Sequence, residues 1–168
     1  MASPAIMERV PSIVSFSPPK QNYDVYISHR AKDTGSGFAA DLHKALTAQG
    51  IVVYRDENEN ENEGKMLTEK LTAIEESRSS IVVFSENYGD LVSMKELAKI
   101  GMYKEVRDQL VLPIFYQIDP AHVRKQKGNF EKPFIEHEEN VGFEEVQSWR
   151  DSMFEVGNLS GWHLQEQQ

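Results

Sequence analysis

Short apolar runs rich in β-branched and aromatic residues recur along the first two thirds of the chain. Runs of this length and composition, bounded by polar or glycine-containing stretches, are typical of buried β-strands. The pattern therefore predicts strands at Tyr23–Ser28, Ile51–Arg55, Ser80–Ser85 and Leu110–Tyr116.

Amphipathic stretches lie between and after these runs. In the first of them Phe38, Leu42 and Leu46 share one helical face, and Gly50 marks a helix end. The same spacing predicts helices at Phe38–Gln49, Met66–Ser77, Leu91–Arg107, Phe130–Glu139 and Val146–Val156. A last short strand is predicted within Asn158–Leu164, and the acidic stretch Asp56–Gly64 reads as a solvated loop.

The alternation of strands and helices predicts the fold class. Strands that are apolar almost throughout need cover on both faces, which is typical of a parallel sheet between two helical layers. With right-handed crossovers this gives an α/β, doubly wound parallel sheet of four to five strands with helices on both faces. We expect a flexible leader at 1–21, one domain at 22–164 and a disordered tail at 165–168.

Composition narrows the function classes. The formal net charge of −9 disfavours nucleic-acid binding, which normally depends on clustered Lys and Arg. No apolar run is long enough to cross a bilayer, so no membrane partner is expected, and the histidines show no spacing typical of a metal site. The absence of cysteine fits a reducing compartment, so we expect a cytoplasmic protein, with the nucleus as an additional location.

Ligands of doubly wound sheets bind at the carboxyl ends of the strands. Glu96 lies near the start of the helix that follows the predicted strand Ser80–Ser85, one residue off the apolar stripe of that helix. We expect its carboxylate to be partly shielded from water. Two interpretations stand at this point: a surface glutamate beside Lys95 and Lys99, or a carboxylate aimed into a cleft.

A dinucleotide-binding fingerprint is one explanation for this edge. Gly35–Ala40 reads G-x-G-x-x-A between a strand and a helix, and Asp56 stands about 20 residues further on, where a ribose-binding acid belongs. Six residues, Arg30 to Gly35, follow His29, however, so the loop after the strand is too long for this motif. The fingerprint needs its first glycine to end the strand, so the spacing disfavours this explanation.

A resemblance gives the other explanation. The strings YDVYISHRAKDT, AIEESRSSIVVFSENY, KELAKI, LPIFYQIDPAHVRKQKGNF and WRDSMFEVGNLSGWHL, taken in order, resemble a Toll/interleukin receptor (TIR) domain of the plant immune-receptor type. The resemblance runs from Tyr23 to Leu164 and implies a flavodoxin-like sheet.

The resemblance also implies an activity. Plant TIR domains that this chain resembles cleave NAD at the nicotinamide–ribose bond, releasing nicotinamide and ribosyl nucleotide signals in plant defence. NAD is then a substrate, and no cofactor is implied. The catalytic glutamate of the family falls on Glu96. A carboxylate there can bind the ribose hydroxyls and stabilise the oxocarbenium-like transition state.

Further site positions follow from the same resemblance. The loop after the first strand is expected against the ribose or phosphates, and Gly64 matches the glycine of the mobile BB loop that gates the pocket. Ser85 and Tyr88 are candidates for lining the pocket, with capping and packing as equal alternatives. Val92 and Ser93 stand where the family has a Trp-Cys pair. The expected substrate-binding set is His29, Arg30, Ala31, Lys32, Asp33, Gly64, Ser85, Tyr88, Val92 and Ser93.

The expected partners are NAD and other TIR domains, because catalysis in this family depends on homo- or hetero-oligomers. Several family positions differ here, including the Trp-Cys pair and the loop Arg30–Gly35. The alternative function is therefore a catalytically weak interaction module that signals by TIR–TIR docking.

Overall fold

The protein is described as a computed structural model, which covers residues 20–55 and 63–165. The predicted leader, most of the acidic loop and most of the tail thus lie outside the described residues. The elements in chain order are β1 (Tyr23–Ser28), α2 (Ala31–Thr34), α3 (Phe38–Ala48), α4 (Glu63–Glu75), β2 (Ser77–Phe84), α5 (Leu91–Arg107), β3 (Leu110–Tyr116), α6 (Pro120–Lys125), the 3-10 helix η1 (Gly128–Phe130), α7 (Glu131–Asn140), α8 (Phe143–Gly157) and β4 (Trp162–Leu164).

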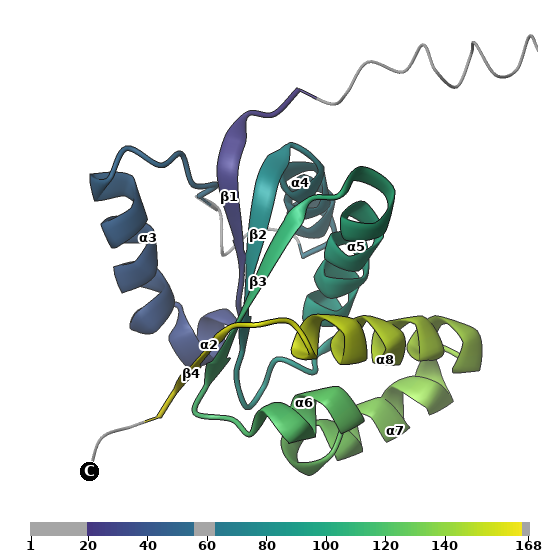
Figure 1. Cartoon of the computed structure of the whole chain (residues 1–168). Helices are drawn as coiled ribbons and strands as arrows, with labels where there is room; N and C mark the ends of the chain where they lie inside the picture. Colours follow the sequence, from purple (N-terminus) through teal and green to yellow (C-terminus); the bar gives the residue numbers. More distant parts are fainter. Residues whose placement is uncertain (1–19, 56–62, 166–168) are drawn as a thin grey trace, which may run out of the picture.

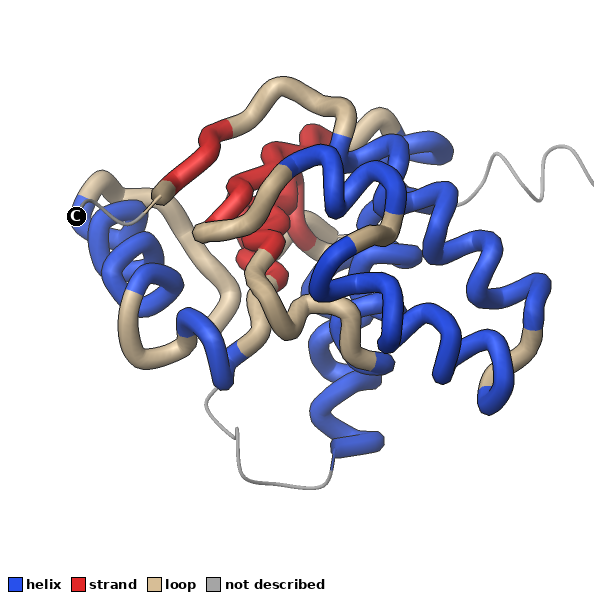
Figure 2. The backbone as a smooth tube through the Cα atoms, turned by 90° about the horizontal axis from the view of Figure 1, so that it is seen from below, coloured by secondary structure: helices blue, strands red, loops and turns tan. Residues whose placement is uncertain are grey.

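The strands form one parallel sheet in the order β1-β2-β3-β4. Helices lie on both of its faces, as Figure 1 shows, so the predicted fold class is confirmed. Seen from below in Figure 2, the strands run through the centre with helical segments on either side. Sequence periodicity predicted this arrangement because strands buried on both faces need apolar side chains in both directions.

The two faces carry unequal cores. The larger core lies under α4, α5 and α8 and includes Ile74, Leu97 and Trp149, each at most 1% exposed. On the opposite face α3 packs Phe38, Leu42 and Leu46 against the smaller cluster of Ile81, Val83 and Ile114. Glu96 points into the side of the larger core, where burial of a charged group is most costly.

The predicted strand at Ile51–Arg55 is wrong as a full strand. Only Val53 pairs with β1, through an isolated parallel bridge to Val25. The backbone N–H of Asp24 donates to the Val52 carbonyl at 2.8 Å, but the Val52 N–H donates to the Asp24 carboxylate instead of a backbone carbonyl. The side chain thus takes over one position of the ladder, and Val52 is 52% exposed at the sheet edge.

Two other predicted boundaries, those of α4 and β2, differ from the observed ones. The helix predicted at Met66–Ser77 is α4, which begins at Glu63 and ends at Glu75, and β2 starts at Ser77 rather than Ser80. Ser77 was predicted as the last residue of that helix, but its hydroxyl donates to the Ala73 carbonyl at 2.6 Å and its backbone pairs with Tyr23 in the sheet. Trp162 on β4 is 59% exposed.

Candidate active site

The site lies where the direction of winding reverses. The bridging segment at Val53 lies on one side of β1 and β2 on the other, so the chain leaves β1 and β2 toward opposite edges of the sheet. A crevice at the carboxyl ends of two such strands is the usual ligand position in open α/β sheets. In this protein the loop after β1 and the loop after β2 meet there.

These two loops are tied together by hydrogen bonds. Asp33 in α2 accepts from the Ser85 hydroxyl at 2.5 Å, from the Asn87 backbone N–H at 2.8 Å and from the Asn87 side-chain amide at 2.7 Å. Arg30 pairs with Asp90 at 3.2 Å. Burial raises the pKa of Asp33, but the bonds from Asn87 and Ser85 outweigh it and hold the pKa below its ordinary value.

Helix α5 carries Glu96 into this region. Asp90 caps the helix by accepting from the Ser93 N–H at 3.4 Å, and Glu96 follows in the second turn. The residue is only 3% exposed. The interpretation as a surface glutamate is therefore wrong, and the shielding is more complete than the sequence predicted.

The Glu96 carboxylate is held by hydroxyl groups of β1. The Tyr26 hydroxyl donates to Glu96 Oε1 at 2.5 Å, and the Ser28 hydroxyl reaches the same oxygen at 3.3 Å. Ser28 in turn lies 2.6 Å from the Tyr88 hydroxyl, so the buried polar groups form one connected network. Networks of this kind are favourable only when their members are satisfied.

Burial raises the pKa of Glu96 from 4.5 to about 7. The positive charge of Lys70 on α4 and the hydrogen bonds from Tyr26 and Ser28 lower it, while the negative charge of Asp90 raises it further. The carboxyl group thus titrates near neutral pH. Perturbed values of this kind are enriched at functional sites, where they suit a group that exchanges charge with a reacting centre.

The predicted site residues divide into three sets. Ser85, Tyr88 and Ser93 are buried close to the strand ends and α5, where they act through hydrogen bonds and packing. His29, Arg30, Asp33 and Val92 are partly exposed around the same edge, and His29 Nδ1 lies 3.3 Å from the Thr34 hydroxyl. Ala31 and Lys32 are exposed on α2.

Two sequence interpretations are corrected here. Gly64 was expected in a loop, but its backbone lies in the first turn of α4. The dinucleotide fingerprint does not have the required geometry, because α2 intervenes between the end of β1 at Ser28 and Gly35. A glycine that follows a helix instead of ending a strand does not bring the pyrophosphate to the helix N-terminus.

Tyr26 and Ser28 were not predicted as site residues. The available signal was their spacing: residues two apart on a strand point to the same face, and both carry hydroxyls beside the apolar Val25 and Ile27. Since β1 runs beside α5, this face is the one that Glu96 meets. Polar residues at alternate positions of a buried strand were therefore the pattern to look for.

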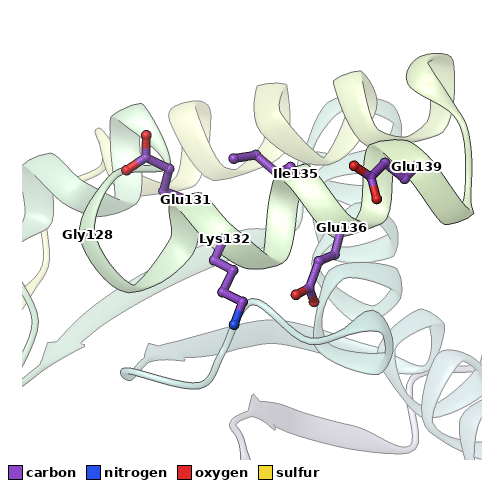
Figure 3. A pocket seen from close by; sticks show the side chains of 6 residues that line it. All are labelled: Gly128, Glu131, Lys132, Ile135, Glu136 and Glu139. Carbon is purple, nitrogen blue, oxygen red and sulfur yellow. The ribbon is translucent and has the colours of Figure 1, made fainter.

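A separate hollow lies on α7 and is unrelated to Glu96. Figure 3 shows it lined by Gly128, Glu131, Lys132, Ile135, Glu136 and Glu139. Its lining carries more negative than positive side chains, which disfavours a phosphate-bearing ligand. None of the predicted site residues belongs to it.

Two searches of the described residues bear on ligands and membranes. Within 20–55 and 63–165, no group of three or more His, Asp or Glu side chains is arranged to hold a metal ion. Among the helices of the same residues, none has the length and apolar character needed to span a bilayer.

The parallel sheet with helices on both faces, together with a buried glutamate on α5 beside the ends of β1 and β2, defines the class of protein. The chain belongs to the TIR domain family, whose family model matches residues 22–168. This confirms the resemblance seen in the sequence.

Its relatives include plant disease-resistance proteins. The chain is 44% identical over 148 residues to disease resistance protein RPV1 of Vitis rotundifolia, covering 88% of this chain and 10% of RPV1. It is 41% identical over 150 residues to TMV resistance protein N of Nicotiana glutinosa, covering 88% of this chain and 13% of that protein. The chain therefore spans only a small part of the curated relatives it matches.

A solved structure has the same fold. The TIR domains in the structure of the activated Roq1 resistosome, which directly recognises the pathogen effector XopQ, match with a TM-score of 0.75 and 36% identity. The match covers 85% of this chain and 88% of the Roq1 chain.

Proposed function

We propose that this TIR domain hydrolyses NAD to nicotinamide and a ribosyl nucleotide when several copies associate, with Glu96 as the catalytic carboxylate. The observation that supports the proposal most is the position of Glu96: a buried, ionisable carboxylate on α5, beside the carboxyl ends of β1 and β2. Membership of the TIR family and the similarity to plant disease-resistance proteins agree with it.

The chemistry suits a single carboxylate. Cleavage breaks the bond between ribose C1′ and the nicotinamide nitrogen, and the electron pair of that bond neutralises the pyridinium as it leaves. The ribose carries positive charge in the transition state, which a nearby carboxylate stabilises. Water then adds its oxygen to C1′ and gives up a proton, for which a carboxylate of pKa about 7 is a suitable acceptor.

The proposal includes association because the Glu96 carboxylate is buried in the single chain. A group that is 3% exposed cannot contact a dinucleotide until neighbouring side chains move. The Roq1 match is to the TIR domains of an activated resistosome. We therefore expect TIR–TIR contacts to stabilise the open form, and NAD and other TIR domains to be the partners.

The test is nicotinamide release by the domain fused to an oligomeric scaffold and supplied with NAD. Glu96→Gln is expected to lower turnover by at least about 100-fold, the usual effect of removing a group that stabilises transition-state charge. Glu105→Gln, an exposed change on the same helix, is the matched control and should retain turnover. Equal turnover by the scaffolded wild type and Glu96→Gln would reject the assignment.

One observation favours a second candidate, a module that signals by docking to other TIR domains without catalysis. The Glu96 carboxylate is already satisfied by Tyr26 and Ser28 in the closed chain, as a purely structural group would be. This candidate predicts no nicotinamide release on any scaffold, together with measurable binding to a second TIR domain. Both quantities can be measured on the same preparation.

A further inference from the structure

We propose that Tyr26 is a positioning residue for the reaction: its hydroxyl fixes one oxygen of Glu96 and leaves the other oxygen to face the ribose. This inference rests on the proposed function and adds to it a residue outside the expected site. It comes from the hydrogen-bond geometry around Glu96.

The carboxylate is held on one side. Tyr26 donates to Oε1 at 2.5 Å and Ser28 to the same atom at 3.3 Å, so both hydrogen bonds end on one oxygen. Such an arrangement fixes the rotation of the carboxyl plane, and no hydrogen bond from a described residue ends on Oε2. A carboxylate that must meet two vicinal ribose hydroxyls gains from this, because its orientation is set before the substrate arrives.

Tyr26 itself has little freedom. It is 2% exposed, and its strand pairs with Ser80 of β2. Its ring stacks on Tyr54 with centroids 5.6 Å apart, and Tyr54 meets Tyr23 edge-on at 5.3 Å. Aromatic side chains confined in this way lose few rotamers when they orient a partner.

The hydroxyl also maintains the charge that the reaction needs. Among the residues that the structure describes, four charged or titratable groups face Glu96: Lys70 from α4, Tyr26 from β1, Tyr88 from the loop after β2, and Asp90 at the start of α5. Burial raises the pKa of Glu96, and among the opposing contributions the hydrogen bond from Tyr26 comes next after the charge of Lys70. Burial and the charge of Glu96 hold the pKa of Tyr26 well above 10, so the phenol remains a donor throughout the working range.

The same contact has an opposite interpretation, in which it inhibits the reaction. If Tyr26 served to keep Glu96 away from substrate, removing its hydroxyl would increase turnover at every pH. If it positions the carboxylate, removal should lower turnover, and most strongly at acidic pH, where Glu96 without its donor takes up a proton. The two readings thus differ in the sign of the effect and in its pH dependence.

The experiment measures kcat and KM for NAD between pH 6 and 9 on the scaffolded protein. Tyr26→Phe is expected to move the acidic limb of kcat upward by about one pH unit, which is about a tenfold loss at pH 6. A smaller loss should remain at pH 9, where the carboxylate is charged but its orientation is no longer fixed. The matched control is Tyr23→Phe, because Tyr23 lies on the same strand and packs on Tyr54 instead of Glu96. It should keep the wild-type profile.

The outcomes separate the two proposals. A wild type that releases nicotinamide while Tyr26→Phe shows an unchanged, uniformly scaled or increased profile overturns the positioning role and leaves the proposed function intact. A wild type without nicotinamide release on the scaffold overturns both. Thermal unfolding of each variant is measured alongside. A loss that comes from unfolding lowers the amount of active protein equally at all substrate concentrations, so it lowers kcat and leaves KM unchanged.

Discussion

Asp33 accepts hydrogen bonds from both the backbone N–H and the side-chain amide of Asn87, at 2.8 and 2.7 Å. A two-point contact of this kind fixes the loop after β1 against the loop after β2 in one orientation. The resemblance placed Asp33 among the ligand contacts, but in the closed chain its carboxylate is used to join these loops. The edge of the sheet at the ends of β1 and β2 is thus organised by a residue for which the resemblance implied substrate binding.

Asp33→Ala should destabilise the fold and loosen this edge. A hydrogen bond to a charged group contributes about 1.5–3 kcal/mol, and such contributions are not additive within one network. The free energy of unfolding measured in urea should therefore fall by roughly 2 kcal/mol at pH 7. Because the folded pKa of Asp33 lies below its ordinary value of 3.8, its contribution is present above 3.8 and is lost as the pH falls through the folded value. Asp41→Ala, exposed on α3, is the control, and an equal cost for the two changes would contradict the role given to Asp33.

Glu96→Gln should stabilise the protein at alkaline pH. The folded pKa of about 7 lies above the ordinary 4.5, so the folded state holds the proton more tightly and wild-type stability falls as the pH rises from 4.5 through 7. Glutamine stays neutral and avoids this cost. The gain at pH 8 is expected to be on the order of 2–3 kcal/mol and close to zero at pH 4.5, measured by thermal or urea unfolding.

The result also bears on function. A site residue kept at the expense of stability is typical of catalytic groups. If Glu96→Gln changed stability by the same amount at pH 4.5 and pH 8, the carboxylate would not carry a burial cost in the folded chain. The raised pKa of Glu96 would then be wrong, independently of the effect of the variant on NAD cleavage.

Sequence patterns predicted best where a single periodicity dominates. Helix α5 and strand β3 have the predicted bounds, Leu91–Arg107 and Leu110–Tyr116, because a long amphipathic stretch ends beside a continuous apolar run. The prediction of a strand at Ile51–Arg55 was wrong because an apolar pattern carries no information about strand pairing. In the structure the Asp24 side chain accepts the hydrogen bond of the Val52 N–H. Which residues complete a sheet edge depends on the partner strand.

The candidate site was predictable only in part. Glu96 could be placed by resemblance and by its position on α5, but its partners Tyr26 and Ser28 lie 70 and 68 positions away in the chain. Nothing in the order of residues shows that β1 presents these hydroxyls to α5 until the strand order is known. The exposure of Trp162 depends on the strand order in the same way: β4 lies at its end, where an aromatic side chain need not be covered.

Gly161→Ala should disrupt β4 selectively. A Cβ at this position would lie 2.0 Å from the Pro113 carbonyl oxygen and 2.8 Å from the Pro113 ring, so the backbone has to move away from β3. The change is expected to cost about 1–3 kcal/mol, as overpacking usually does. The amide of Gln117, which donates to the Leu164 carbonyl at 2.7 Å, should exchange hydrogen faster. Ser160→Ala, at an exposed neighbouring position, is the control, and unchanged protection of the Gln117 amide in Gly161→Ala would contradict the close approach.

His137→Phe tests how α7 supports the start of α5. His137 Nε2 donates to the Gly89 carbonyl at 2.8 Å, and its ring packs edge-on against Phe134 and Trp149 with centroids 6.1 and 5.3 Å apart. Phenylalanine keeps the aromatic packing but leaves the carbonyl of buried Gly89 without its donor, which costs roughly 1–3 kcal/mol.

Gly89 directly precedes Asp90, the residue that caps the helix carrying Glu96. The change should therefore lower stability in urea and also reduce protection of the Ser93 amide, whereas His163→Phe, at an exposed site on β4, should do neither. A destabilised His137→Phe with full protection at Ser93 would mean that α7 stabilises the fold without ordering this end of the site.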